Sequence, residues 1–278
     1  MRAFRQVDVF TSRPLFGNPV AVVLDAQGLS DADMQQMAQW TNLSETTFVL
    51  PPDDPAASYR VRIFTPRAEL PFAGHPTLGT AHAVLEAGLA TPVNGKLIQQ
   101  CAVGLVDVTI DGPMRSFRLP RYAASAAPDA DRLCRALGGA GVLAGDPQIL
   151  DVGPRWVIGE FSSTEALSAL VPDLAALADY DRTHQTTGLT LFATGPEGVK
   201  VRSFAPADGI AEDPVCGSGN GAVAAYRLLK GQIGDGDSYQ ASQGREVGRD
   251  GTIHVRIDGA DVHVGGTCVT CVVGTLAI

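Results

Sequence analysis

The stretch EDPVCGSGNGAVAAY, from Glu212 to Tyr226, concentrates residue types that can bind or transform a small molecule. An acidic pair and a proline precede one cysteine, three glycines within five residues, and a run of small apolar residues. A glycine-rich turn that opens a helix offers free backbone N–H groups and the positive end of the helix dipole, which suit a small anion such as a carboxylate. A dinucleotide or nucleotide phosphate is less well supported, because no hydrophobic strand immediately precedes the glycines and no Gly-Lys-Ser/Thr follows them.

An anion cradle binds a substrate but does not move protons, so an acid or base is also needed. Cys216 stands at the helix start, where the dipole favours the reactive thiolate, although a small buried core residue is an equal alternative. His75 follows Gly74 at a second glycine-containing helix start, and it too has a purely structural alternative. Glu45, in TNLSETTFVL, lies between a helix and a strand, where composition alone favours an exposed turn residue.

The segments that carry these residues resemble each other within the chain. RIFTPRAELPFAGHPTLGTAHAVLEAG, from Arg62, aligns with RSFAPADGIAEDPVCGSGNGAVAAYRLLKG, from Arg202, with a three-residue insertion in the second copy. The simplest interpretation is a duplicated half-molecule, although short Gly/Ala-rich stretches can also align by chance. Each copy reads Arg-x-Phe-x-Pro, a variable loop and then two glycines fourteen residues apart, which are Gly74 and Gly88 or Gly217 and Gly231.

Alternation of apolar and polar residues dominates the rest of the chain and predicts half-buried strands in a mixed or antiparallel sheet. It is clearest in FRQVDVF, YRVRIF, LVDVTI, VKVRSF and TIHVRI. Helices are expected from Ser30, as N-cap, to about Trp40, over Asp129–Leu137, and over Ser163–Ala178 with an interruption at Pro172.

Two further helices, PTLGTAHAVLEAG and SGNGAVAAYRLLKG, are apolar on nearly every side, which predicts that each is buried inside a sheet. The expected fold class is therefore α+β, with two pseudo-symmetric lobes, each a mixed or antiparallel sheet rolled around a central helix. We expect an N-terminal lobe over residues 1–120, joined by a last strand at about 267–278, and a C-terminal lobe over 121–266. PRYAASAAPDA predicts a linker near Leu119–Ser125, and the site is expected between the lobes.

Whole-chain composition excludes several classes of partner. With 278 residues, 45% apolar and 18% charged, the chain is a well-cored globular protein. A formal net charge of −9 without a basic stripe argues against nucleic acid and anionic membrane surfaces. The N-terminus has no apolar targeting segment and no run is long enough to span a membrane, so a cytoplasmic location is expected.

The five cysteines do not predict a disulfide framework, because their number is odd and they are scattered. Cys268 and Cys271 form a CxxC within TCVTCVVGTLAI, which is typical of a buried strand. Residues three apart on a strand point to opposite faces, and no second CxxC completes a zinc site. A metal or redox role for this pair is the less favoured alternative, and no metal is expected.

Four stretches together make the sequence similar to the PhzF-like family of isomerases, whose fold resembles that of diaminopimelate epimerase and proline racemase. They are VDVFTSRPLFGNPVAVV, NLSETTFV, FAGHPTLGTAH and RSFAPADGIAEDPVCGSGNGA, spread over most of the chain. The resemblance implies two lobes with a cleft between them, a homodimer, a small carboxylic acid as substrate, and no cofactor, metal or nucleotide.

Site residues follow from the same resemblance. It implies that Glu45 shuttles a proton between two substrate carbons, and that His75, Asp213 and Ser218 orient and polarise the substrate. The best-known family activity isomerises trans-2,3-dihydro-3-hydroxyanthranilic acid on the route to phenazines. A carboxyl group in a water-poor cleft suits a residue that acts first as base and then as acid. The further residues expected to bind substrate are Asn18, Gly74, Cys216, Gly217 and Gly219.

One departure from the family pattern leaves alternatives open. Where relatives commonly read ATGS, this chain reads VCGS, which places Cys216 where epimerases and racemases keep one of two catalytic thiols. The partner position holds Ala73, so a symmetrical two-thiol racemase is excluded. An amino-acid epimerase that uses Glu45 and Cys216 remains an alternative to the favoured isomerase, and so does a non-catalytic small-molecule-binding protein.

Overall fold

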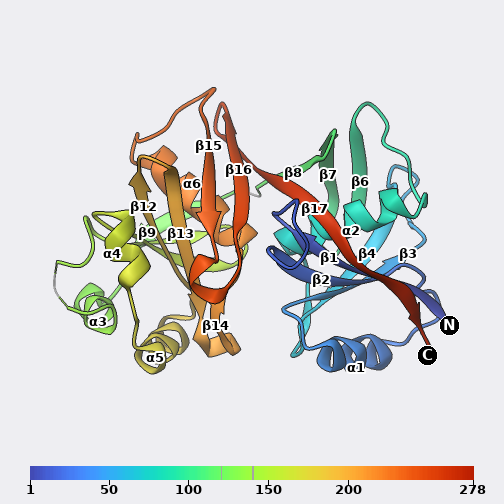
Figure 1. The fold of residues 1–278 in the computed structure, drawn as a ribbon, viewed down its shortest axis with the longest axis horizontal. Coiled ribbons are helices and arrows are strands. Elements are labelled where there is room, and N and C mark those ends of the chain that lie inside the picture. The colour runs from blue at the N-terminus through green and yellow to red at the C-terminus, as the bar shows by residue number, and fades with distance from the viewer. Residues whose placement is uncertain (120, 140) are drawn as a thin grey trace. The chain divides into compact units, whose positions relative to one another are not determined.

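The computed structural model describes residues 1–119, 121–139 and 141–278. By its internal contacts the chain divides into two compact units, Met1–Arg118 with Gly265–Ile278, and Leu119–Val264. In each unit, strands surround one helix (Figure 1). The fold is therefore α+β with two similar units, as the sequence predicts.

Strands of the first unit close into a barrel through an unbroken ring of pairings, including β8 with β17. The pairings β2 with β3 and β4 with β6 are parallel. Residues of β17 from Cys268 onward pair with β1, so the C-terminal run is part of this barrel. In ring order the strands are β1 (Arg2–Val9), β2 (Asn18–Val23), β3 (Thr46–Leu50), β4 (Tyr59–Phe64), β6 (Lys96–Cys101), β7 (Gly104–Asp111), β8 (Met114–Arg118) and β17 (Asp261–Leu276). The first residues of β17, up to Val264, belong to the second unit.

Helix α2 (Gly74–Glu86) packs against six strands of this barrel and is almost entirely buried. Its glycines and alanines permit the close approach: a Cβ on Gly79 would lie 2.4 Å from Cγ1 of Val20 and 2.9 Å from Cγ2 of Val9. Helix α1 (Asp31–Thr41) covers the outside, and Ser30 and Asp33 form the expected N-cap as a reciprocal capping box. A short strand, β5 (Glu69–Leu70), pairs with β4.

In the second unit the paired strands run in the order β9–β10–β11–β12–β13–β15–β16, with β14 against β13. Helix α6 (Gly217–Leu229) packs against β10, β11, β12 and β16, and its buried face includes Val223 and Tyr226. The strands are β9 (Ala123–Ala126), β10 (Gln148–Asp151), β11 (Arg155–Glu160), β12 (Gly188–Gly195), β13 (Gly198–Ala205), β14 (Ile210–Asp213), β15 (Ser238–Gln243) and β16 (Gly251–Asp258).

Three helices cover the outside of the second unit. They are α3 (Ala130–Ala136), α4 (Thr164–Ala169) and α5 (Leu174–His184), and their buried leucines share one core with Val157 and Leu191 of the sheet. Two single-turn helices, η1 (Pro206–Asp208) and η2 (Arg245–Val247), complete the unit.

The internal repeat is visible in the geometry of the two units. Helices α2 and α6 both have thirteen residues, and each is followed by a glycine with positive φ, 68° at Gly88 and 67° at Gly231. In both units one helical crossover joins two parallel strands on the outside of the sheet, β2 to β3 and β11 to β12. The repeat is therefore structural and extends beyond the aligned motif.

The expected linker and the expected end of one helix need correction. The linker predicted at Leu119–Ser125 is wrong in part, because Ala123–Ala126 pairs with β10 as β9, while Pro120 lies outside the described residues. The helix expected to end at Ala178 does break near Pro172, but its second half, capped by Asp173, continues to His184. Tertiary packing onto the sheet decides where such helices end.

The CxxC strand is present, but its alternation is interrupted. Val7 pairs with Thr270 and Gln6 with Val272, so a β-bulge falls at Cys271 and strict alternation between Cys268 and Cys271 is wrong. The thiols are free, and burial raises the pKa of Cys268 to about 12. Within the described ranges, no group of three or more His, Cys, Asp or Glu side chains could hold a metal ion.

Candidate active site

Glu45 is held at the entrance to a parallel strand pair. Helix α1 ends at Asn42 in the left-handed region, with φ 54°, and the chain turns there into β3. The backbone N–H of Ala21 donates to the carbonyl oxygen of Glu45 at 3.4 Å, so the register of β2 and β3 fixes the residue. The glutamate is placed by the sheet and not by a free loop.

The Glu45 carboxyl group is buried and lies beside a histidine. Its side chain is 14% exposed, and Oε2 lies 3.3 Å from Nε2 of His75. Burial raises the pKa of Glu45 to about 7, against a weaker lowering by the hydroxyl of Ser44. The composition-based expectation of an exposed turn glutamate is therefore wrong. A carboxyl group with this pKa is able both to accept and to donate a proton at neutral pH.

His75 is the second residue of α2 and is itself buried, with 6% of its surface exposed. The N-cap residue, Ala73, provides no side-chain cap for the first N–H groups of the helix. Gly74 is required for packing, since a Cβ there would lie 2.7 Å from Cζ of Phe117. Glycine therefore lets the start of the helix lie directly on an aromatic ring.

Asn18 belongs to the same group of side chains. It is the first residue of β2, is fully buried, and its Oδ1 accepts a hydrogen bond from Oγ of Ser44 at 3.5 Å. Ser44 adjoins Glu45, so the first unit brings together Asn18, Glu45, Gly74 and His75 from three separate stretches of sequence.

In the second unit, Cys216 caps α6. Its Sγ accepts the backbone N–H of Gly219 at 3.2 Å, and the residue is 4% exposed. Gly219 has no room for a side chain, because a Cβ would lie 2.6 Å from Oγ1 of Thr190 and 2.9 Å from Oγ of Ser203. The GSG turn is thus shaped by contacts with β12 and β13.

Gln243, a residue that sequence reasoning missed, ties this helix start together. Its Oε1 accepts from the backbone N–H of Cys216 at 3.1 Å and from Nδ2 of Asn220 at 2.8 Å. Its Nε2 donates to the carbonyl oxygen of Asp213 at 3.0 Å. Asp213 in turn accepts the N–H of Val215 on Oδ1 at 3.0 Å. Gln243 comes from β15, and no spacing rule connects it to the motif.

Trp156 is the second residue that was missed. Its indole Nε1 donates to Oγ of Ser218 at 3.0 Å, and that oxygen lies 3.6 Å from Sγ of Cys216. Trp156 is buried in β11, some sixty residues before the motif, where its hydrophobic bulk gives no sign of a polar role. The second unit thus groups Asp213, Cys216, Gly217, Ser218 and Gly219 with supports from β11 and β15.

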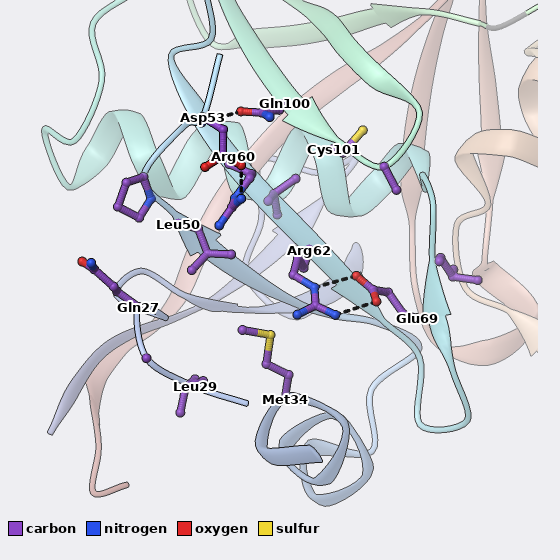
Figure 2. A pocket seen from close by; sticks show the side chains of 15 residues that line it. Gln27, Leu29, Met34, Leu50, Asp53, Arg60, Arg62, Glu69, Gln100 and Cys101 are labelled. Atoms are coloured by element: carbon purple, nitrogen blue, oxygen red, sulfur yellow. Dashed lines mark hydrogen bonds and ion pairs between the residues drawn. The ribbon is translucent and has the colours of Figure 1, made fainter. Parts of the chain in front are cut away.

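A cavity of about 670 Å³ lies on the first unit (Figure 2). Arg60 and Arg62 of β4 both face it, but Asp53 pairs with Arg60, and Glu69 and Asp31 pair with Arg62. Its only thiol, Cys101, has a pKa raised by burial. None of the predicted site residues lines this cavity, and its charges are already paired.

The chain is similar over nearly its whole length to a known protein family and to several of its members. The family model PhzC-PhzF, described as phenazine biosynthesis-like protein, matches residues 7–274. Antisense-enhancing sequence 1 of Schizosaccharomyces pombe is 40% identical over 288 residues, 98% of this chain and 97% of that protein. The trans-2,3-dihydro-3-hydroxyanthranilate isomerase of Pseudomonas aeruginosa is 37% identical over 280 residues, 97% of this chain and 95% of that protein.

A solved structure has the same fold. The phenazine biosynthesis protein of the PhzF family from Bacillus anthracis superposes with a TM-score of 0.87 at 23% sequence identity. The alignment covers 100% of this chain and 99% of that one, so the whole architecture is shared.

Proposed function

The chain belongs to the family of phenazine biosynthesis-like proteins and is an isomerase; from this premise we propose that it moves a proton between two carbon atoms of a small cyclic amino or hydroxy carboxylic acid. The observation that carries the proposal is the buried Glu45 carboxyl group, with a pKa of about 7 and His75 at 3.3 Å. Dihydro-3-hydroxyanthranilate, the substrate in the name of the Pseudomonas relatives, is the model compound.

In the proposed mechanism, ionised Glu45 removes a proton from one carbon, and the electron pair of that C–H bond enters the conjugated system of the substrate. The carboxyl group then returns the proton to a second carbon, and a new C–H bond forms there. Atoms and electrons balance within the substrate, so the rearrangement needs no oxidant or reductant. We therefore propose a cofactor-independent reaction.

The remaining site residues have binding roles in this proposal. His75 and Asn18 orient the substrate near Glu45, while Asp213, Ser218 and the backbone N–H groups of Gly217 and Ser218 bind its polar groups, including the carboxylate. Gly74, Cys216, Gly217 and Gly219 supply close backbone approach. We further propose that the protein acts as a homodimer in the cytoplasm. We also propose that it has no nucleic acid or membrane partner, because its net charge of −9 would repel both. None of the helices that the described residues form is long and apolar enough to cross a membrane.

The test is proton NMR in deuterated water with dihydro-3-hydroxyanthranilate, related cyclic acids and several amino acids. Wild type should introduce deuterium at a ring carbon, and Glu45→Gln should slow this by about 10²-fold or more, since it removes the acid–base group. Glu197→Gln, on a 91% exposed glutamate, is the matched control and should exchange like wild type. Exchange by Glu45→Gln at the wild-type rate would remove Glu45 from the mechanism.

The same experiment tests the epimerase alternative, for which the specific observation is the thiol of Cys216 at the start of α6. Deuterium at the stereocentre of a single amino acid, with loss of optical rotation, would indicate epimerisation. Cys216→Ser replaces the capping sulfur with an oxygen that can still cap the helix. If that variant exchanges like wild type on the true substrate, the thiol takes no part in the chemistry.

A further inference from the structure

The two units can be matched residue by residue through their strand registers. The anchor is the phenylalanine of the repeated Arg-x-Phe-x-Pro motif, which in each unit pairs with an antiparallel strand that precedes it in the sequence. The matched pairs are Thr46 opposite Phe64 in the first unit and Leu189 opposite Phe204 in the second.

This register assigns a counterpart to the proposed proton shuttle. One residue before the matched pair, Glu45 of the first unit corresponds to Gly188 of the second. In the neighbouring parallel strands, Ala21 pairs with Thr46 and Val157 pairs with Leu189, so Ala21 and Val157 correspond. One residue earlier in these strands, Val20 of the first unit therefore corresponds to Trp156 of the second. The second residues of the central helices, His75 and Ser218, also correspond.

At the position that corresponds to Glu45, the second unit excludes any side chain. A Cβ on Gly188 would lie 2.1 Å from the carbonyl oxygen of Phe204 and 2.9 Å from Cζ3 of Trp156. The indole ring lies over this glycine and reaches Ser218 at 3.0 Å. Where the first unit places a carboxylate beside the second residue of its helix, the second unit therefore places an N–H donor.

Hydrogen-bond chemistry then determines what Ser218 can offer to a ligand. An indole N–H is only a donor, so Oγ of Ser218 accepts from it and has its own proton left to donate. Sγ of Cys216, at 3.6 Å, already accepts the N–H of Gly219 and is a weak acceptor for that proton. A carboxylate oxygen is a far stronger acceptor.

We propose that Trp156 is a specificity-determining positioning residue, which holds Ser218 as a hydrogen-bond donor so that the second unit selects an ionised carboxylate of the substrate and supplies no second base. This inference rests on the proposed function and extends it. It explains why a duplicated protein keeps one proton-shuttling glutamate: the indole occupies the matching position in the other copy.

The test replaces only the donor. Trp156→3-benzothienylalanine keeps the shape of the ring and puts sulfur in place of N–H, so packing is retained. Dissociation constants are measured by calorimetry for anthranilate and for anthranilamide, which differ in the carboxylate alone. Four proteins are compared: wild type, this variant, Ser218→Ala, and the double variant.

We expect wild type to bind anthranilate at least about tenfold more tightly than the amide, because a hydrogen bond to a charged group contributes about that much. Each single variant should reduce this preference about tenfold, and the double variant should be no worse than Ser218→Ala. Equal binding of both probes by wild type, or multiplied effects in the double variant, would overturn the proposal.

A second readout separates positioning from structural damage. With a compound that wild type exchanges in deuterated water, the Trp156 variant should raise KM about tenfold and change kcat by less than about threefold. A fall in kcat comparable to that of Glu45→Gln would instead place Trp156 in the proton transfer itself. Failure of wild type to exchange any compound would sink the proposed function, while the probe preference would remain measurable.

Discussion

Glu45 acquires its reactive pKa from its position in the fold. Desolvation disfavours the ionised form of a carboxyl group, and the neighbouring Ser44 hydroxyl only partly offsets that effect. An isolated exposed glutamate would titrate far below neutral pH, so at pH 7 it would be a weak base with almost no protonated form to donate a proton. Burial thus prepares one side chain for both directions of proton transfer, at a cost in stability.

That cost gives a prediction that needs no substrate. The pKa of Glu45 is 4.5 in the unfolded reference and about 7 in the folded protein, so the folded state binds the proton more tightly. The contribution of Glu45 to the free energy of unfolding is greatest below pH 4.5, falls as the pH rises to about 7, and no longer changes above that pH. Glu45→Gln should therefore become more stable than wild type across this window, by up to roughly 3 kcal/mol at pH 8.

Urea unfolding of both proteins at intervals between pH 4 and pH 8 measures this difference, because titrating groups that do not interact with Glu45 contribute equally to both proteins. A gap between the two proteins that does not widen with pH would show that Glu45 titrates normally in the fold.

At the scale of elements, the two buried helices depend on glycines that allow the surrounding side chains to pack closely against them. Gly79 of α2 faces β1 and β2, and the nearest atoms belong to the stiff, buried side chains of Val9 and Val20. Gly221 of α6 instead faces the more flexible Leu119. Because the barrel surrounds α2 on several sides, the helix has little freedom to move away from an added methyl group.

Gly79→Ala should destabilise the first unit by about 1–3 kcal/mol, since overpacking outweighs the better helix propensity of alanine. Gly145→Ala is the matched control: it is an exposed loop glycine with open space around its Cβ position and no positive φ. Thermal unfolding should show a lowered Tm for the first variant and an unchanged Tm for the second. An unchanged Tm for Gly79→Ala would mean that the barrel strands move apart enough to accommodate the added methyl group.

The sequence was most informative where a pattern is local. Alternation predicted the strands, the apolar helices predicted the buried centres of both units, and the Ser30 cap was found in full. What it missed depends on pairing between distant strands. Burial of Glu45 comes from the β2–β3 register, Trp156 reaches Ser218 across the sheet, and the bulge at Cys271 arises from the match with β1. The linker was misjudged because AASA lacks strand residues but finds a partner in β10.

At the scale of the whole molecule, duplication has preserved an ion pair but changed its surroundings. Arg202 of β13 holds Glu212 through two hydrogen bonds, and Arg62 of β4 holds Glu69 in the same way (Figure 2). Arg202 and Glu212 are only 6% and 9% exposed, and Arg202 also donates to the carbonyl oxygens of two residues near the end of α4. Arg62 and Glu69 are 27% and 38% exposed.

The two copies therefore provide an internal comparison of one interaction at two depths. Arg202→Leu leaves a buried carboxylate and two carbonyl oxygens without their donor, which should cost about 3–5 kcal/mol. Arg62→Leu leaves a carboxylate that water can reach, which should cost no more than about 1 kcal/mol. Urea unfolding gives both values, and hydrogen exchange followed by mass spectrometry assigns each loss to its unit. Equal losses would show that position in the repeat, and not burial, sets the strength of the pair.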